Sequence, residues 1–496
     1  MLASARTFTV DGVSAREVRV EVDVHRGLPA FSIVGLPDAA VRESRERVRA
    51  ALVNCGFEFP LRRITVNLAP ADVPKAGPGI DLAIAAALLA ASDQTSPELT
   101  EGVALAGELA LDGSVRKIAG VLAMAEAARA AGLRRLVVAT ANGAEAALID
   151  GLAVLCLERL DQLPALLAGE LVPAPPGPLN LADGLAGTPD ISDLRGQPGL
   201  LRALEVAAAG GHSLLMIGPP GAGKSLAARR LPSILPPLER DEALEVARIE
   251  SVAGTLDGSV GRPFRAPHHT ISYAGLVGGG NPPRAGEVTL AHRGVLFLDE
   301  IAEFGRRTLE SLRAPLEEGR IKVVRAGRAV ELPCRFMLIA AANPCPCGLG
   351  EDDDDCGCPP LAVRRYQAKL SGALADRIDI RRGVSQPNPE AMQGVAAADA
   401  TALRKRVRDA RRRQAERHGP GRCNAEIGPA ELRRLEVDDD ARTELVDRHR
   451  RLRLSGRGHD RVLRVARTVA DLEGSGTVRL GDVREALDLR SRKDPP

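Results

Sequence analysis

Aromatic residues are scarce in this sequence of 496 residues, which holds no Trp, 2 Tyr and 8 Phe. A mechanism that needs a row of stacked aromatic rings is therefore disfavoured, and the cores have to be built from Leu, Val, Ile and Ala. An excess of charge of one sign is also absent, because 67 Lys and Arg residues stand against 65 Asp and Glu residues. Together with 45% hydrophobic residues, this balance rules out an extreme polybasic or polyacidic protein and argues against a mostly disordered chain.

Long apolar runs are missing as well. The longest apolar stretch, residues 80–91, carries Asp81 and is too short to span a bilayer. Residues 1–12 contain no basic segment followed by an apolar one, so they lack the pattern of a signal peptide. The sequence predicts a soluble cytoplasmic protein without a membrane partner.

Composition divides the chain, which is long enough for about three domains. Residues 1–168 form a first segment, and residues 169–195 are rich in Pro and Gly and are interpreted as a linker. Short apolar runs alternate with helical patterns over residues 196–385, which predicts a parallel α/β sheet. Residues 400–496 have helical periodicity. Residues 401–496 hold 25 Lys and Arg against 17 Asp and Glu, a net charge of +8, which leaves −6 for residues 1–400.

The strongest motif is SLLMIGPPGAGKS at residues 213–225. An apolar strand leads into a Gly-rich turn, and Lys224 and Ser225 then open a helix, which is the spacing and context of a P-loop. Backbone N–H groups of such a loop surround phosphate oxygens, Lys224 reaches the β and γ phosphates and Ser225 binds Mg²⁺. The sequence therefore predicts ATP and Mg²⁺ as cofactors. The predicted nucleotide-binding residues are Gly218, Pro219, Pro220, Gly221, Ala222, Gly223, Lys224 and Ser225.

Polar residues end two further apolar strands. GVLFLDE at residues 294–300 ends in Asp299, which we expect to hold Mg²⁺ with Ser225, and in Glu300, which we expect to polarise the attacking water. FMLIAAANP at residues 336–344 ends in Asn343, which we expect to orient that water near the γ phosphate.

These motifs, followed by SGALADRIDI at residues 371–380, resemble an AAA+ ATPase module, a P-loop parallel sheet with a helical lid. The details resemble the magnesium chelatase-like ComM/YifB family over essentially the whole chain. The segments that carry this resemblance are RPFRAPHHTIS (262–272), LVGGGNPPRAGEVTLAHRGVLFLDE (276–300), LEEGRIKVVRAG (316–327), AANPCPCG (341–348) and LRLSGRGHDRVLRVARTVADLEG (452–474).

The resemblance implies roles for three arginines. Arg377 would be the arginine finger that acts on the nucleotide of a neighbouring subunit, and an ion pair with Asp376 or Asp379 is the alternative. Arg457 would be the sensor-2 residue, although Arg461 and Arg464 follow at helical spacing and leave that assignment open.

The N-terminal segment resembles the proteolytic domain of Lon proteases over residues 73–92 and 103–138. The resemblance implies an α+β Lon-protease-like fold. It places Gly79 where that family has its nucleophilic Ser and Leu122 where it has its Lys base. Glycine has no nucleophile and leucine cannot accept a proton, so we expect no Ser-Lys peptidase activity.

Four cysteines cluster in an insertion at residues 345–358 as two C-x-C pairs. Four thiolates at this density in a reducing compartment favour tetrahedral Zn²⁺ over disulfides, and a redox-silent loop is the alternative. The acidic residues 351–355 are interpreted as a solvated loop. The candidate zinc ligands are Cys345, Cys347, Cys356 and Cys358.

Two basic elements are candidates for DNA contacts. Residues 319–332 predict a β-hairpin that turns at Ala326-Gly327 and carries Lys322, Arg325 and Arg328. A loop that grips a polymer in the pore of a ring is one interpretation, and a solvent-exposed basic hairpin is the alternative. Residues 404–418 predict a basic helix, for which the outer face of a charged helix, with Asp409 and Glu416 in register, is the alternative. His268 and His269 are interpreted as part of a polar loop near the nucleotide or in a pore.

The resemblance implies a homo-hexameric ATPase that drives branch migration of DNA in recombination and natural transformation. The partner would be branched or single-stranded DNA, held by Arg and Lys contacts to its backbone. Two alternatives stay open. One is a magnesium chelatase-type motor subunit, and the other is a protein-remodelling AAA+ ATPase that docks a client on the N-terminal domain.

Overall fold

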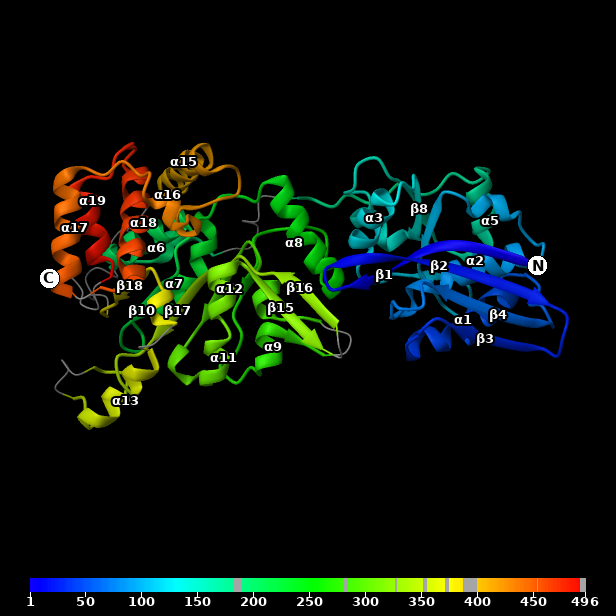
Figure 1. The fold of residues 1–496 in the computed structure, drawn as a ribbon, viewed down its shortest axis with the longest axis horizontal. Coiled ribbons are helices and arrows are strands. Elements are labelled where there is room, and N and C mark those ends of the chain that lie inside the picture. The colour runs from blue at the N-terminus through cyan, green and yellow to red at the C-terminus, as the bar shows by residue number, and fades with distance from the viewer. Residues whose placement is uncertain are drawn as a thin grey trace.

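The computed structural model describes residues 1–181, 189–280, 284–325, 328–350, 355–370, 374–386, 399–452 and 454–490. The molecule is elongated, with the N-terminal domain at one end and the last helices at the other (Figure 1). The ATPase-like sheet lies between them. The chain therefore runs from one end of the molecule to the other.

The N-terminal domain is built on a seven-stranded mixed sheet in the order β3-β4-β2-β1-β5-β8-β9. Strands β1 and β2 form a long antiparallel hairpin, and β5, β8 and β9 run parallel to β1 and to one another. The strands are β1 (Leu2–Asp11), β2 (Ser14–His25), β3 (Ala30–Val34), β4 (Arg63–Ala69), β5 (Val103–Ala106), β8 (Arg135–Ala139) and β9 (Ala153–Leu157).

Helices cover both faces of this sheet. The main helices are α1 (Ala39–Asn54), α2 (Asp81–Ala91) and α3 (Val121–Ala130), with α4 (Gly143–Ala146) and α5 (Leu163–Ala168). Helix α2 is apolar on all sides and every residue of it is buried, which is the pattern of a core helix. Its one charge, Asp81, accepts a 2.6 Å hydrogen bond from Arg47 Nε. No described helix is both long and apolar enough to traverse a lipid bilayer.

The second sheet has five parallel strands in the order β11-β14-β17-β10-β18. They are β10 (Leu214–Ile217), β11 (Phe264–Arg265), β14 (Val295–Leu298), β17 (Met337–Ala342) and β18 (Ile380–Gly383). All residues of β14 and β17 are buried, as expected for strands covered on both faces. The predicted parallel sheet is confirmed for the described residues.

The C-terminal segment is helical, as predicted. It contains α15 (Ala400–His418), α16 (Pro429–Leu432), α17 (Asp439–Leu452), α18 (Gly456–Leu472) and α19 (Leu480–Asp488). Buried residues of these helices share one core with α6 (Pro198–Gly210), α7 (Lys224–Arg230) and one face of the second sheet. The helical segment is thus packed directly on the sheet.

The predicted hairpin is present as β15 (Arg320–Arg325) and β16 (Arg328–Pro333), whereas the predicted turn residues lie outside the described part of the chain. Ile321 and Val323 are buried on one face, and Lys322 is exposed on the other. Between the second and third strands of the module lie short elements: α9 (Tyr273–Val277), β12 (Gly278–Gly279), β13 (Arg284–Ala285) and α10 (Glu287–Leu290).

The basic helix α15 is largely committed to contacts within the chain. Arg404 donates to Ser233 O, Arg406 donates to Glu205 Oε1, and Arg411 donates to Ala208 O. Arg412 pairs with Asp409 at 3.4 Å and with Glu416 at 3.9 Å on the same helix. These contacts agree with the interpretation of residues 404–418 as a charged helix with Asp409 and Glu416 in register, and DNA binding by this helix stays a prediction.

Helix α8 (Arg240–Ala253) joins the N-terminal domain to the ATPase-like module. Its apolar residues share a core with α3 and β8. At its C-terminal end, the carbonyl of Ser251 accepts a 2.8 Å hydrogen bond from Gly120 N, and the Ser251 hydroxyl donates to Glu145 Oε2 at 2.6 Å and accepts from Leu122 N. Arg248 pairs with Glu126 at the rim. Directional contacts therefore fix how the two parts dock.

We expect Ser251→Ala to weaken this docking. The change leaves the buried carboxylate of Glu145 without its hydroxyl donor, which costs about 1–3 kcal/mol of stability. Thermal unfolding should show a lower midpoint, and amide exchange should rise first in α3. Ser259→Ala, at an exposed serine beyond the same helix, is the control and should leave both unchanged. Equal behaviour of the two variants would contradict this role of Ser251.

Candidate nucleotide-binding site

The P-loop connects β10 to α7, as the motif predicts. Gly218 has to be a glycine, because a Cβ atom there would lie 1.9 Å from the carbonyl oxygen of Val384. Gly223 has φ +83° and caps α7 in a left-handed conformation that favours glycine. Close packing on the residue after β18 thus explains Gly218, and the start of α7 explains Gly223.

Lys224 lies folded into the loop, with 8% of its surface exposed. Its Nζ donates to Gly218 O at 2.5 Å, to Pro219 O at 2.8 Å and to Asn343 Oδ1 at 3.2 Å. Burial lowers the pKa of Lys224, and the charge of Asp299 opposes this shift. Loop carbonyls and the amide of Asn343 thus hold the ammonium group where a phosphate would compete for it.

Ser225 and Asp299 meet at the adjacent strand end. The Ser225 hydroxyl donates to Asp299 Oδ2 at 2.7 Å, although the two residues are far apart in sequence. A hydroxyl and a carboxylate are the hard oxygen donors that Mg²⁺ prefers. This pair fits the predicted magnesium site.

Glu300 follows Asp299 at the edge of the sheet and is exposed. It has φ +49°, an uncommon backbone conformation for a residue with a side chain. His269 Nδ1 lies 3.8 Å from Glu300 Oε2, and the His269 ring packs edge-on against Phe304. The polar loop of His268 and His269 therefore lies beside the predicted water-activating carboxylate, which is one of the two places that the sequence suggested.

Tyr366 is a neighbour of this site that the sequence did not indicate. It lies on α13 (Pro360–Leu370) and is 8% exposed. Burial raises its pKa, and a hydrogen bond with the backbone of Asn343 opposes this shift. No motif marks Tyr366. Only its rarity, as one of 2 tyrosines in the chain, could have drawn attention to it.

A second polar cluster lies at the other edge of the same sheet. A cavity of about 560 Å³ is lined by Ser213, Gly294, Met337 and Asp379, which stand at the amino ends of β10, β14, β17 and β18. The P-loop, Asp299 and Asn343 follow the carboxyl ends of these strands. The cavity and the P-loop therefore open at opposite edges.

The structure places Arg377 and Arg457 together in this second cavity. Both pair with Glu317 on α12 (Arg313–Glu318), at 2.8 Å for Arg377 and 3.5 Å for Arg457. Arg377 is 9% exposed, whereas the side chain of Arg457 is 62% exposed. Within one chain, the two arginines thus lie across the sheet from the predicted phosphate site.

Arg461 holds the segment that carries Arg377. It donates to the carbonyl of Arg377 at 2.6 Å and to Asp379 Oδ1 at 2.5 Å. Burial alone would raise the pKa of Asp379, but His212 and Arg461 outweigh it and keep the pKa well below its usual range. Arg464 donates to Ile427 O instead. Of the three candidate sensor-2 residues, Arg457 is the one set beside Arg377 with an exposed side chain.

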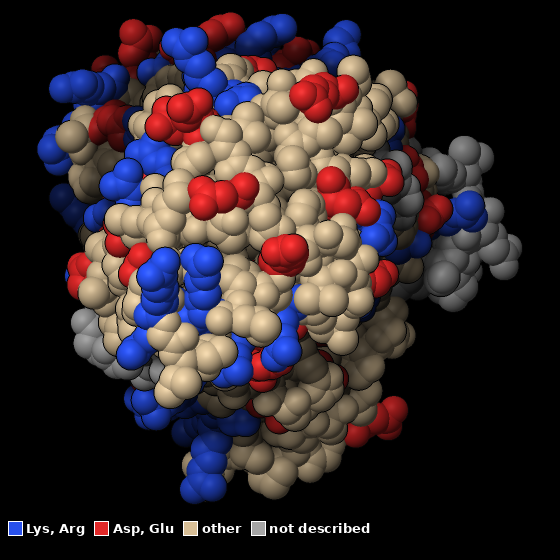
Figure 2. Space-filling view, turned by 90° about the vertical axis from the view of Figure 1, so that its right-hand side faces the viewer, with Lys and Arg blue, Asp and Glu red and all other residues tan. Residues whose placement is uncertain are grey.

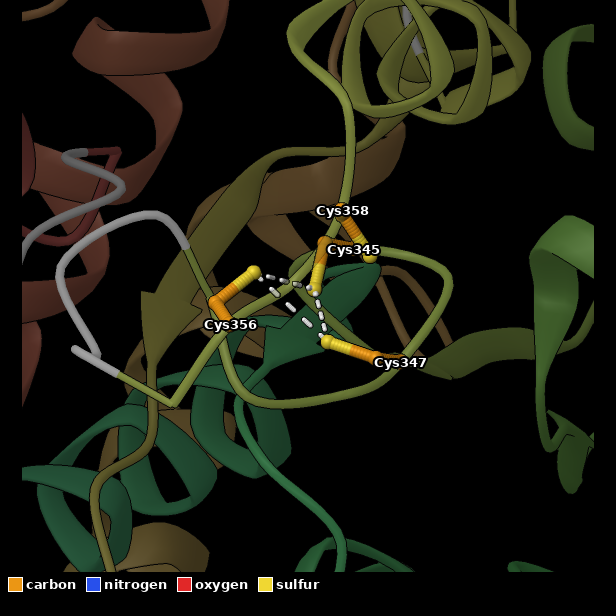
Figure 3. A group of neighbouring side chains, drawn as sticks. All are labelled: Cys345, Cys347, Cys356 and Cys358. Carbon is orange, nitrogen blue, oxygen red and sulfur yellow. Dashed lines mark hydrogen bonds between the residues drawn. The ribbon is translucent and has the colours of Figure 1, made fainter.

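The four clustered cysteines converge, as Figure 3 shows. Their Sγ atoms lie within 4.8 Å of one another. The distances from Cys345 to Cys347 and Cys356 are 3.2 and 3.8 Å, and Cys347 lies 3.6 Å from Cys356. A hydrogen bond from the backbone N–H of Leu349 is the largest of the contacts that lower the pKa of Cys347 to about 7. Residues 351–354 of the acidic loop lie outside the described part.

A P-loop between a parallel strand and a helix, with Asp299, Glu300 and Asn343 at neighbouring strand ends and a helical segment packed on the sheet, defines the class: a P-loop module of the AAA+ type. A family model described as "Magnesium chelatase, subunit ChlI" matches residues 190–392. Models for "Subunit ChlI of Mg-chelatase" and for its C-terminal part match residues 20–142 and 397–490.

Curated relatives match over nearly the full chain. An uncharacterized protein of Mycobacterium tuberculosis is 44% identical over 99% of this chain and 98% of its own. YifB of Salmonella typhimurium is 43% identical over 99% and 97%, and competence protein ComM of Haemophilus influenzae is 39% identical over 97% and 96%. The chain belongs to the magnesium chelatase-like ComM/YifB family of AAA+ proteins. Lon protease 2 of Bacillus subtilis is 30% identical over only 31% of this chain and 32% of its own.

The geometry predicts a separation of nucleotide binding from hydrolysis. Lys224→Ala removes the cation that we expect to bind the phosphates, so binding of a fluorescent ATP analogue should be lost. Glu300→Gln keeps the loop intact and removes the predicted water-activating carboxylate, so the analogue should bind with an unchanged Kd while the hydrolysis rate falls by about 100-fold or more. Loss of binding in Glu300→Gln, or hydrolysis that survives it, would contradict the assigned roles.

Proposed function

We propose that copies of this chain form a hexameric ring in which ATP hydrolysis drives branch migration of DNA strands during recombination or natural transformation. The observation that supports a ring is the separation of the predicted site residues within one chain. Arg377 and Arg457 lie across the sheet from the P-loop of their own chain. The 39% identity with competence protein ComM over 97% of this chain supports DNA as the substrate.

The residues divide the chemistry between two subunits. Lys224 binds the β and γ phosphates, and Asn343 and Glu300 orient and deprotonate the attacking water. Mg²⁺, held by Ser225 and Asp299, neutralises charge on the phosphates when bound. Arg377 of the adjacent copy stabilises the charge of the transition state, and Arg457 accompanies it as sensor 2. Such an arginine contributes about 10³–10⁵ in rate, so hydrolysis depends on assembly.

The hairpin β15–β16 is the proposed DNA-contacting element. Its exposed Lys322 stands opposite the buried face that anchors the hairpin. Figure 2 views the molecule from the end that the N-terminal domain forms. Positive and negative side chains are interspersed there among uncharged areas. Because the chain has few aromatic residues that could stack on bases, we propose sequence-independent contacts of Lys and Arg with the DNA backbone.

We also propose that the N-terminal domain has a Lon-protease-like fold without peptidase activity. A Cβ atom on Gly79, at the position of the Lon nucleophile, would lie 2.8 Å from Ile118 Cδ1. Leu122, at the position of the Lon base, is buried, and its N–H is bonded to Ser251 of the docked helix α8. Neither position therefore supplies a nucleophile or a base for peptide cleavage.

Branch migration on a synthetic Holliday or three-strand junction tests the function. The wild type with ATP should convert the junction to products, and Lys224→Ala should not. Equal behaviour of the two proteins would contradict the proposal. ATPase activity stimulated by unfolded protein and not by forked DNA would favour the protein-remodelling alternative.

A charge variant in a DNA-binding titration at several salt concentrations tests the hairpin. Lys322→Ala should weaken DNA binding and reduce the slope of log affinity against log salt by about one per phosphate contact. Arg62→Ala, at an exposed arginine of the N-terminal domain, is the control and should keep both values. A Lys322→Ala variant that keeps the wild-type slope would exclude this residue from the DNA contacts.

Mixed rings test the shared site. Lys224→Ala and Arg377→Ala should each be inactive alone, but random mixing pairs an intact P-loop with an intact finger at about a quarter of the interfaces and should restore ATPase activity accordingly. Arg457→Ala should complement Lys224→Ala in the same way. Mixtures that stay inactive would contradict action from the neighbouring copy.

A further inference from the structure

The cysteine cluster is continuous with the nucleotide site through the backbone. Strand β17 ends at Ala342, Asn343 follows it, and Cys345 comes two residues later. Cys345 is completely buried. The residue that reaches Lys224 from this strand end is therefore separated from a cluster thiol by Pro344 alone.

The cysteine loop, residues 345–350, also lies against the P-loop. Gly348 has φ +94°, and a Cβ atom there would lie 2.8 Å from Pro220 Cδ and 3.9 Å from Asn343 Cγ. The backbone N–H of Gly350 donates to Cys345 Sγ at 3.2 Å. Backbone N–H groups that bond to sulfur stabilise a thiolate and orient it for a metal. The cysteine loop is thus packed closely on Pro220, with Asn343 beside it.

Helix α13 starts directly after the second cysteine pair and returns to the same site. It projects from the body of the module in Figure 1. Val363 and Tyr366 are buried at its inner side, and Lys369 donates to Ala302 O at 3.2 Å, next to the strand end that carries Glu300. Residues 356–358 thus connect the cysteine cluster to a helix that packs beside the strand end of Glu300.

We propose that Cys345, Cys347, Cys356 and Cys358 bind one Zn²⁺ ion, and that this ion clamps the cysteine loop and α13 onto the nucleotide site so that Asn343 and the P-loop are held for hydrolysis. The clamp rests on the proposed ATPase function, whereas the metal site stands apart from it. The ion has no part in the chemistry of ATP.

The thiol geometry supports zinc. Zn–S bonds of about 2.3 Å in a tetrahedron require sulfur atoms about 3.8 Å apart, and three separations in the cluster are 3.2, 3.6 and 3.8 Å. Thiolates alone select soft ions and disfavour Mg²⁺ and Ca²⁺. Four thiols from two short segments close the coordination shell, which leaves no position for a reacting water and is typical of a structural site.

Metal analysis tests the site directly. The purified full-length chain should contain one zinc per chain, and replacement by Co²⁺ should give the intense thiolate-to-metal absorption of a tetrahedral site with four sulfur ligands. Cys356→Ser and, separately, Cys358→Ser should lose the ion. Cys55→Ser, at a half-buried thiol of the N-terminal domain, should keep it. A wild type without zinc, an iron centre in its place, or full zinc in both cluster variants would overturn the metal site.

Nucleotide assays on the same proteins test the clamp. Cys356→Ser and Cys358→Ser should hydrolyse ATP about tenfold or more slowly than the wild type, as is usual when a supporting metal shell is disturbed. Circular dichroism and the thermal unfolding of the N-terminal domain should stay unchanged. Zinc-free variants that hydrolyse ATP at the wild-type rate would overturn the clamp. If the wild type itself hydrolyses no ATP, the proposed function fails, and the zinc count still decides the metal site.

Discussion

The direction of the five parallel strands is the constraint on which the site depends. Their carboxyl ends meet at one edge, so the P-loop, Asp299 and Asn343 gather there. Their amino ends meet at the other edge. Asp379, the residue before β18, lies there, and Arg377 comes two residues before it. Four residues of β10 span about 13 Å, which keeps the two groups apart. One chain therefore offers the predicted phosphate-binding groups at one edge and the two arginines at the other, and copies arranged head to tail would bring these edges together.

The helical segment is tied to the arginine edge through a buried carboxylate. Asp379 is 4% exposed and accepts hydrogen bonds from His212 and from Arg461 of α18. A buried charge that loses its partners costs several kcal/mol, so α18 and the strand end at Asp379 move together. Because Arg457 is on the same helix, a displacement of the helical segment would shift Arg457 and Arg377 as one unit.

The sequence was sufficient where the chemistry is local. A P-loop needs small residues and a lysine at fixed spacing, and Asp299 and Asn343 are recognisable because each ends an apolar strand. Contacts between distant segments were not predictable. Glu317 joins two arginines that are 80 residues apart, and the sequence had suggested Asp376 or Asp379 for one of them. The basic stretch in α15 has the composition of a DNA-binding helix, but acceptors on α6 and other elements occupy several of its arginines.

The docking of α8 attaches the N-terminal domain to the AAA+ module. The start of α3, where a Lon-like domain would need an accessible lysine, is instead the surface that receives Ser251 and the end of α8. The tip of the β1–β2 hairpin reaches the same module, because Gly12 packs against Val330 of β16. Two separate contacts therefore fix the domain beside the proposed DNA-contacting hairpin. The surface at the start of α3 is thus used for attachment to the module, and the domain holds the hairpin from the side of Val330.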